Sequence, residues 1–472
     1  REDDRIRFDA LDARIGQASI AVNGSIGDPP TYEGTELEIA VEGPNLADFS
    51  GLFGHSLPAT PFSITGGFTK ASGAIQLEDV QARIGQSDVA VDGTLRTENA
   101  GVGTELTIVA GGPSATEIGP FIGRTDLPND EWRVAGRATL LSRGVRLEGV
   151  SGSLGELRVA ADGTVGTEEG LVGTDVELRI QEPDLRHLAD LATVAEMPAE
   201  PLRAHGRVVV SEAGFEIHGV EAISRDIAVT AEGHIGRPPG LDGTDLELSA
   251  RGSGLDRWSA LTGITLPDDR FEVDGGLRLS DGGYGLQEIT VTLGGTRATI
   301  HGVLFPHDDL AGTEIRLDIA GESLRETGRV VAITTGMTMP ELPELPFSLS
   351  SGLAIDGAAY RVDGLRATLA DSNAVVDGRI GRGPRRVGTD LRFSAQGSDA
   401  SFLAVITGAT VPAAPFQLSG GVQRYATGYE FDRLVARIGR YRADVDGTVG
   451  EWPRLVGTDA VVHASGPSLA LV

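Results

Sequence analysis

The residues that most often carry out catalysis are few in this chain and are not arranged for it. There are eight histidines and no cysteine, so the chain cannot use thiolate chemistry or form a disulfide. His205 and His218 come nearest to a pair of metal ligands. A hairpin turn at 212–213 would place Arg207, rather than His205, opposite His218, and both histidines have the spacing of a solvent-facing side. We therefore expect no metal site at these histidines.

Motifs of familiar enzyme classes are also missing from the sequence. It contains no nucleophile elbow, no P-loop and no His-Glu-x-x-His zinc motif. The segment DGGYG, which begins at Asp281, resembles a glycine-rich loop, but no strand–helix unit surrounds it, so we interpret it as a turn. The sequence therefore predicts a protein that is not an enzyme, with no catalytic residue, no cofactor and no metal.

Aspartate–glycine pairs recur along the chain and raise the question of calcium. They begin at Asp92, Asp162, Asp377 and Asp446. Calcium loops need several oxygen ligands close together, and no loop of that density is present. Asp-Gly is also a common hairpin turn. We therefore interpret these pairs as turns between strands.

Composition narrows the range of partners. The formal net charge is −28, which excludes nucleic acid as a partner, because phosphates need a basic face. An anionic membrane surface is a poor partner for the same reason. The chain has 66 glycines and only 5% aromatic residues, a composition that fits short strands with many turns. No apolar run approaches the roughly 18 residues that a membrane helix needs.

An internal repeat of about 70 residues organises the chain. Each repeat opens with a Gly-Thr-Asp or Gly-Thr-Glu anchor, and a second pattern, ARIGQSDVAVDG from Ala82, recurs as ARIGRYRADVDG from Ala436. The anchors begin at Gly34, Gly103, Gly173, Gly243, Gly312, Gly388 and Gly457. The repeats are 34–102, 103–172, 173–242, 243–311, 312–387 and 388–456, with partial repeats at 1–33 and 457–472. Because the chain begins and ends inside a repeat, we expect it to be a fragment of a longer protein.

Each repeat is predicted to contain four strands and one short helix. In the first strand Leu37 and Ile39 alternate with Glu36 and Glu38, which gives the strand one apolar face. A short helix then begins after an N-cap residue such as Asn45, and a Leu-Pro pair ends it. The second strand opens on an aromatic residue or leucine, and two further strands complete the repeat.

The apolar alternation slips by one residue within the third strand of the repeats. A slip at the same place in successive repeats predicts a β-bulge that bends the sheet. The slips fall at Leu77/Val80, Leu147/Val150, Ile217/Val220, Leu286/Ile289, Val362/Leu365 and Phe431/Leu434. Repeat 312–387 is longer than the others, and its extra residues precede Phe347 in the helix region, where an insertion is tolerated best.

These elements predict a mainly β fold, an elongated and repetitive antiparallel sheet bent into a hydrophobic groove with one short helix per repeat. A sandwich, a closed barrel or a bent open sheet would each cover the apolar face of such strands. The regular spacing favours the groove over a few separate sandwiches. Three placements of the helices stay open: they would plug an end of the groove, brace its outer wall or lie along its mouth.

The anchors, the passage from helix through Leu-Pro to Phe, and strand pairs such as GYGLQEITVTLGGTRATIHG from Gly283 resemble the repeats of the AsmA-like family. Relatives of this kind are AsmA, TamB and YhdP of Gram-negative bacteria. The resemblance covers the chain repeat by repeat and includes no catalytic signature. It implies an inner-membrane anchor outside this chain, a β-groove in the periplasm, and transport of phospholipid towards the outer membrane.

We expect the groove to be lined by apolar residues of inward parity, with no charge among them. The predicted lining residues are Leu37, Ile39, Phe62, Ile64, Leu77, Val89, Val91, Leu106, Ile108, Trp132, Val134, Leu147, Val159, Leu178, Val208, Ile217, Leu246, Leu248, Phe271, Val273, Leu286, Ile300, Leu317, Phe347, Leu349, Val362, Leu391, Phe393, Phe416, Leu418 and Phe431.

Two functions follow from this interpretation. The first is a monomeric, non-enzymatic lipid conduit of the periplasm, involved in outer-membrane biogenesis, whose groove carries phospholipid acyl chains between the inner and outer membranes. The second is a structural or adhesive rod with a closed core and no lipid. The apolar pattern alone is compatible with both, and the resemblance favours the conduit.

Overall fold

The structure is a computed structural model that describes residues 6–53, 57–122, 124, 126–192, 197–306, 310–336, 338–383, 385–401, 403–404, 411–451 and 453–467. The chain divides into an N-terminal unit, 1–225, and a C-terminal unit, 226–472. The fold is mainly β, with 59% of residues in strands and 10% in helices. The predicted fold class is confirmed: the described part contains 27 antiparallel strands that do not close into a barrel, together with a few short helices.

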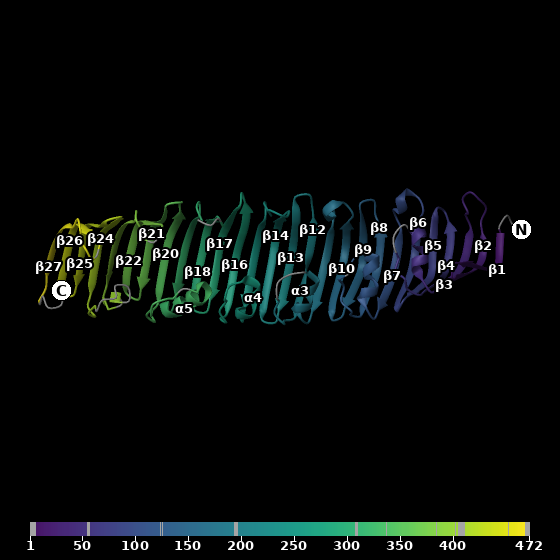
Figure 1. Cartoon of the computed structure of the whole chain (residues 1–472), viewed down its shortest axis with the longest axis horizontal. Coiled ribbons are helices and arrows are strands. Elements are labelled where there is room, and N and C mark those ends of the chain that lie inside the picture. The colour runs from purple at the N-terminus through teal and green to yellow at the C-terminus, as the bar shows by residue number, and fades with distance from the viewer. Residues whose placement is uncertain are drawn as a thin grey trace. The chain divides into compact units, whose positions relative to one another are not determined.

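Within each unit the strands lie side by side in chain order (Figure 1). The N-terminal unit contains β1 (Ile6–Ile15), β2 (Ala18–Ile26), β3 (Thr35–Gly43), β4 (Phe62–Ala71), β5 (Ala74–Ile84), β6 (Ser87–Arg96), β7 (Glu105–Gly112), β8 (Trp132–Leu140), β9 (Gly144–Leu154), β10 (Leu157–Gly166), β11 (Asp175–Glu182), β12 (Leu202–Val210) and β13 (Gly214–Ser224). Its helices are η1 (Leu46–Phe49), α1 (Ser50–Phe53), η2 (Asn99–Gly101), η3 (Ala115–Glu117), α2 (Gly119–Ile122), η4 (Glu169–Leu171) and α3 (Leu185–Ala192).

The C-terminal unit follows the same plan. Its strands are β14 (Ile227–Gly236), β15 (Asp245–Gly252), β16 (Phe271–Ser280), β17 (Gly283–Leu293), β18 (Thr296–Leu304), β19 (Glu314–Gly321), β20 (Phe347–Ile355), β21 (Ala359–Leu369), β22 (Ser372–Gly381), β23 (Asp390–Gly397), β24 (Phe416–Tyr425), β25 (Gly428–Ile438), β26 (Tyr441–Gly450) and β27 (Asp459–Ser465). Its helices are η5 (Leu255–Trp258), α4 (Ser259–Thr262) and α5 (Leu324–Thr335).

The anchor threonine fastens the first strand of a repeat to the strand before it. Thr174 Oγ1 donates to the carbonyl of Leu171 at 2.7 Å and accepts the amide of Gly166 at 2.9 Å. The same two bonds recur at Thr35, Thr244, Thr389 and Thr458. One hydroxyl therefore satisfies both a donor and an acceptor of the connecting segment, which explains the threonine of the anchor. The glycine before it is explained by its backbone, since Gly173 has a φ of +87°.

The predicted bulges are present at the positions of the pattern slip. In the third strand of the first full repeat, Leu77 pairs with Gly93 while Val80 pairs with Val91, so two residues of β5 face one residue of β6. Equivalent register shifts occur in the pairs β9–β10, β17–β18, β21–β22 and β25–β26. In repeat 173–242 the bulge of β13 appears in its pairing with the strand before it, where Gly219 and Val220 face Gly206 of β12. The slip in the alternation was therefore a correct signal of an extra strand residue.

The interpretation of the Asp-Gly pairs as turns is wrong. Asp92 lies inside β6 opposite the bulge, and its Oδ1 accepts the amide of Asp79, an interior residue of the bulge, at 2.9 Å. Asp162, Asp377 and Asp446 accept the corresponding bulge amides at 2.6–3.0 Å. The next residue, Gly93, has to be glycine, because a Cβ there would lie 2.1 Å from the carbonyl oxygen of Glu105 on the next strand. The bulge leaves an amide without a ladder partner, and the aspartate supplies one.

The helices between the first and second strands of the repeats lie on the same side of the sheet as the apolar residues, along one end of the strands, whereas η2 and η4 connect strands at the opposite end. Asn45 caps η1 by accepting the amide of Ala47 at 3.2 Å. Leu46 and Phe49 then pack against Phe62, and the rings of Phe49 and Phe62 meet edge to face at 5.4 Å. Because a repeat has an even number of strands, successive helices return to the same strand ends, as α4 and α5 do in Figure 1. We call this edge the helix margin.

The insertion of repeat 312–387 lengthens its helix. Helix α5 has 12 residues, whereas α1, α2 and α4 have four each and α3 has eight. The prediction that the extra residues fall in the helix region is therefore confirmed. In repeat 388–456 much of the corresponding position, residues 402 and 405–410, lies outside the described residues.

Candidate functional site: the apolar face of the sheet

Apolar residues of neighbouring strands stand opposite one another and form rows across the sheet. Ile64 faces Ala82, Ala82 faces Val89, Val89 faces Ala110, and Ala110 faces Val134. Residues directly opposite in an antiparallel pair project to the same side. These rows therefore form one surface in each unit, which we call the apolar face.

The predicted lining residues all lie on the apolar face of their own unit. The pairing of β3 to β13 brings together those of the N-terminal unit, from Leu37 to Ile217. The pairing of β15 to β25 does the same from Leu246 to Phe431. Their contact with a ligand stays a prediction.

Residues of the apolar face are buried near the helices and also towards the opposite strand ends, where Leu77 is 7% and Val362 9% exposed. Phe62, Trp132, Phe271 and Phe416, which open the second strand of their repeats, are 5–7% exposed. In repeat 103–172 Ala115 packs with Trp132, and Ile118 and Leu127 pack around them. Most of the other predicted lining residues are half-buried, and Val134 reaches 36% exposure.

No second layer of strands packs on the apolar face in the described part of the chain. Extensive contacts join each described strand only to the strands beside it in the sheet. The chain exposes 28206 Å² in all, against about 20,000 Å² expected for two compact globular proteins of half its mass. The half-exposed rows are therefore open apolar surface and not the interior of a sandwich.

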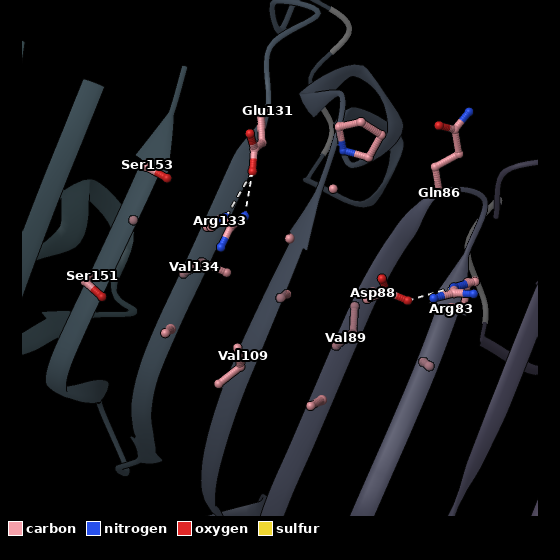
Figure 2. Close-up of a pocket in the computed structure, with 18 of the residues that line it drawn as sticks. Arg83, Gln86, Asp88, Val89, Val109, Glu131, Arg133, Val134, Ser151 and Ser153 are labelled. Carbon is pink, nitrogen blue, oxygen red and sulfur yellow. Dashed lines mark hydrogen bonds and ion pairs between the residues drawn. The ribbon is translucent and has the colours of Figure 1, made fainter. Parts of the chain in front are cut away.

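The opposite side of each strand, the polar face, carries ion pairs. On β4 to β11 it contains a hollow of about 1500 Å³, lined by two rows of polar-face residues and the backbone between them. Arg83 pairs there with Asp88 at 2.7 Å and Arg133 with Glu131 at 2.8 Å (Figure 2). Apolar as well as polar surface lines this hollow, and its lining residues include Val89, Val134 and Val159 of the predicted groove lining.

Among the described residues, three charged side chains lie on the apolar face, so the prediction of an uncharged lining is wrong. Lys70, Glu182 and Arg424 share parity with Phe68, Ile180 and Val422 respectively. All three lie near strand ends, and polar partners are present at Glu182 and Arg424. Arg424, for example, lies over the ring of Tyr429 at 4.3 Å and bonds Glu451 at 2.5 Å.

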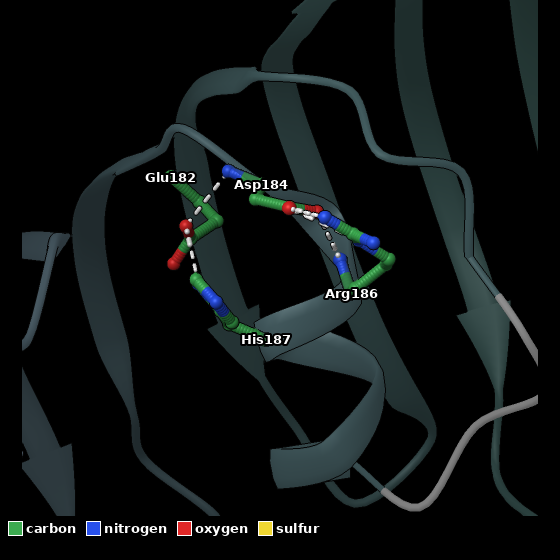
Figure 3. A network of polar contacts seen from close by, with 4 residues as sticks. All are labelled: Glu182, Asp184, Arg186 and His187. Atoms are coloured by element: carbon green, nitrogen blue, oxygen red, sulfur yellow. Dashed lines mark hydrogen bonds and ion pairs between the residues drawn. The ribbon is translucent and has the colours of Figure 1, made fainter.

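Glu182 is the most buried of these charged residues, with 2% exposure. Its Oε1 accepts the amide of Asp184 at 2.9 Å and lies 3.3 Å from Nδ1 of His187 (Figure 3). The Arg186 guanidinium and amide, both bonded to Asp184, lower the pKa of that carboxyl to about 2. The signal for Glu182 was visible in the sequence, because glycine holds the equivalent position at Gly43, Gly112, Gly252, Gly321 and Gly397.

The histidine pair is arranged as the hairpin argument predicted. Arg207 faces His218, and His205 faces Glu221. Across the described residues, no three histidine, aspartate or glutamate side chains cluster closely enough to hold a metal ion. None of the described helices is long and apolar enough to cross a membrane.

Comparison with known proteins gave no matching family model, no matching curated protein and no matching solved structure. The resemblance to AsmA-like repeats therefore stays a prediction.

Proposed function

We propose that this chain is a non-enzymatic lipid conduit whose apolar face carries phospholipid acyl chains. The observation that supports the proposal most strongly is the open apolar surface itself. Rows of aliphatic side chains cross each unit without a second layer above them, and some of these side chains, such as Val134, are exposed.

The energetics favour acyl chains as the occupant. Each methylene group moved out of water contributes about 0.8 kcal/mol, so a row of aliphatic side chains holds a hydrocarbon chain without any specific polar contact. The rows are built from similar residues, such as Ile64, Val89 and Val134 in one repeat pair. Since no one position is bound more tightly than the next, a chain can move along them.

The setting of this activity is carried over from the resemblance to the AsmA-like family. On that basis we place the protein in the periplasm of a Gram-negative bacterium, monomeric, and anchored to the inner membrane by a segment outside this chain. Its partners are then phospholipid and the inner and outer membranes. The net charge of −28 argues against nucleic acid as a partner.

A structural or adhesive rod is the second candidate. It requires a closed core, in which residues such as Val134 would be dry. The 36% exposure of Val134 and the open sheet weigh against this function.

Native mass spectrometry of the chain purified in the presence of phospholipid tests the proposal. We expect bound phospholipid on the wild type. Ile108→Asp, which places a charge on the apolar face of β7, should remove most of it, because a carboxylate beside hydrocarbon is poorly solvated. Val109→Asp is the matched control, since Val109 follows Ile108 but lies on the polar face, 55% exposed. A wild type without lipid, or equal lipid on both variants, contradicts the conduit.

A further inference from the structure

One corner of the apolar face, in repeat 173–242 at the helix margin, differs from the same corner in the other repeats. Its four positions are Glu182, Leu202, Ala204 and Ser224, related through the pairing of β11, β12 and β13. Glu182 replaces a glycine, and Leu202 replaces the aromatic residues Phe62, Trp132, Phe271, Phe347 and Phe416. Ala204 replaces Ile64, Val134, Val273, Leu349 and Leu418, and Ser224 replaces Ile84, Leu154, Leu293, Leu369 and Ile438.

These replacements exchange an apolar corner for one that holds polar side chains. In repeat 34–102 the ring of Phe62 covers Gly43 so closely that a Cβ on Gly43 would lie 2.7 Å from it. Leu202 and Ala204 are smaller than the residues at the same positions elsewhere, so the glutamate fits where the ring would otherwise lie. Two side chains in the corner, Glu182 and Ser224, now bring polar atoms to the edge of the apolar face.

The polar atoms of this corner are buried and incompletely bonded. Glu182 Oε1 is used by Asp184 and His187, but among the described residues Oε2 has no hydrogen-bond partner. Ser224 Oγ is likewise buried without a partner in the described part of the chain. A buried acceptor left unused costs free energy, and such groups call for a water, an ion or a ligand.

The charges around the corner leave Glu182 as the acceptor in need of a cation. Glu200, also buried, pairs with Arg225 at 2.7 Å, and Asp184 pairs with Arg186. The ring of His187 is beside the oxygen that is already bonded, and most of that side chain is exposed. A positively charged donor would therefore bind to Oε2 of Glu182 more strongly than a neutral donor, because charge-assisted hydrogen bonds are stronger.

We infer that this corner binds the primary ammonium group of a phospholipid headgroup of the ethanolamine type. The inference rests on the proposed function, because the acyl chains of the same lipid would lie on the neighbouring apolar rows beside Ala204. A primary ammonium has N–H donors for Glu182 Oε2 and for the hydroxyl of Ser224. A choline headgroup has no N–H and cannot make these bonds.

The test is a competition on the whole chain. The protein is equilibrated with vesicles that contain equal amounts of phosphatidylethanolamine and phosphatidylcholine with identical acyl chains. The bound lipids are then extracted, and the amount of each is measured by mass spectrometry. We expect the ethanolamine lipid to be enriched about tenfold over the mixture, the value of one charge-assisted hydrogen bond. Glu182→Gln, which keeps the shape and removes the charge, should bring the ratio close to that of the vesicles.

Glu177→Gln is the matched control, because Glu177 lies on the polar face of the same strand, β11, where it pairs with Arg179. The ratio should be unchanged in this variant. Lipid bound without a headgroup preference, or the same preference in Glu182→Gln, overturns this inference and leaves the conduit intact. Binding of free O-phosphoethanolamine in place of the lipid overturns it as well. A chain that binds no lipid at all removes the conduit and this inference together.

Discussion

Ile108 and Val109 are neighbours on β7, both aliphatic, and they belong to opposite faces of the sheet. Ile108 faces Val91 in a row of apolar residues, whereas Val109 faces Ala90 and is 55% exposed in the hollow of the polar face. The comparison teaches that position in the pleat, more than residue type, decides whether a side chain joins the apolar face. The two faces should therefore respond differently to the same substitution.

The largest difference is expected for truncation near the helix margin. Phe62→Ala should lower the free energy of unfolding by about 3–5 kcal/mol, because it removes a buried ring that packs against Phe49 and leaves a cavity. Val109→Ala on the polar face should change it by less than about 0.5 kcal/mol. Denaturant unfolding followed by circular dichroism measures both, and similar values for the two variants would erase the distinction between the faces.

A smaller difference is expected at two adjacent glycines of β4. A Cβ on Gly66 would lie 2.8 Å from the Cα of Val80 at the bulge, whereas a Cβ on Gly67 would lie 3.4 Å from the Cβ of Glu78 on the polar face. Gly66→Ala should therefore cost about 1–3 kcal/mol through strain in the bulge. Gly67→Ala should be nearly neutral. Thermal unfolding of both variants and of the wild type measures the difference. An unchanged unfolding temperature in Gly66→Ala would contradict the close approach of Gly66 to Val80.

The smallest effect concerns an ion pair of the polar face. Arg207 donates two hydrogen bonds of 2.6 Å to Asp175, which lower the pKa of that carboxyl below its ordinary value of 3.8. Because folding lowers this pKa, the pair stabilises the fold at pH values above 3.8, the ordinary pKa of the carboxyl. This stabilisation is lost as the pH falls below that value. Arg207→Gln should return the pKa of Asp175 towards 3.8 and cost less than about 1 kcal/mol at neutral pH, since both side chains are about half exposed.

An NMR titration of the Asp175 carboxyl in the wild type and in Arg207→Gln measures this shift. An unchanged midpoint would mean that the two side chains do not stay paired in solution. A large loss of stability would mean that the polar face contributes to the fold much as the apolar face does.

Much of the fold follows from local patterns in the sequence. The alternation of Leu37 and Ile39 with glutamates predicts a one-sided strand, and the slip between Leu77 and Val80 predicts a bulge; both are present. Asp92 was misread because an Asp-Gly pair suits a hairpin turn, and only the register shows that it faces a bulge amide from inside a strand. The position of the helix margin could not be predicted from the sequence either. The side on which a short helix packs depends on contacts between elements, such as that of Phe49 with Phe62.

The candidate site was predictable as a set of positions but not as a surface. Parity places residues such as Ile64 and Val89 on one face, yet only the structure shows that this face has no second layer. The charged residues at strand ends were missed because an expected apolar lining was extended to every inward position. Glu182 departs from the glycine of the other repeats, and a comparison of the repeats position by position would have found it.

The most direct test of the central claim is photocrosslinking along β7. A photoreactive amino acid is placed in turn at Leu106, Thr107, Ile108 and Val109, and the chain is irradiated with phospholipid vesicles. We expect crosslinked lipid at Leu106 and Ile108, which lie on the apolar face, and little at Thr107 and Val109. Equal crosslinking at all four positions, or none at Leu106 and Ile108, would contradict the proposal that the apolar face carries lipid.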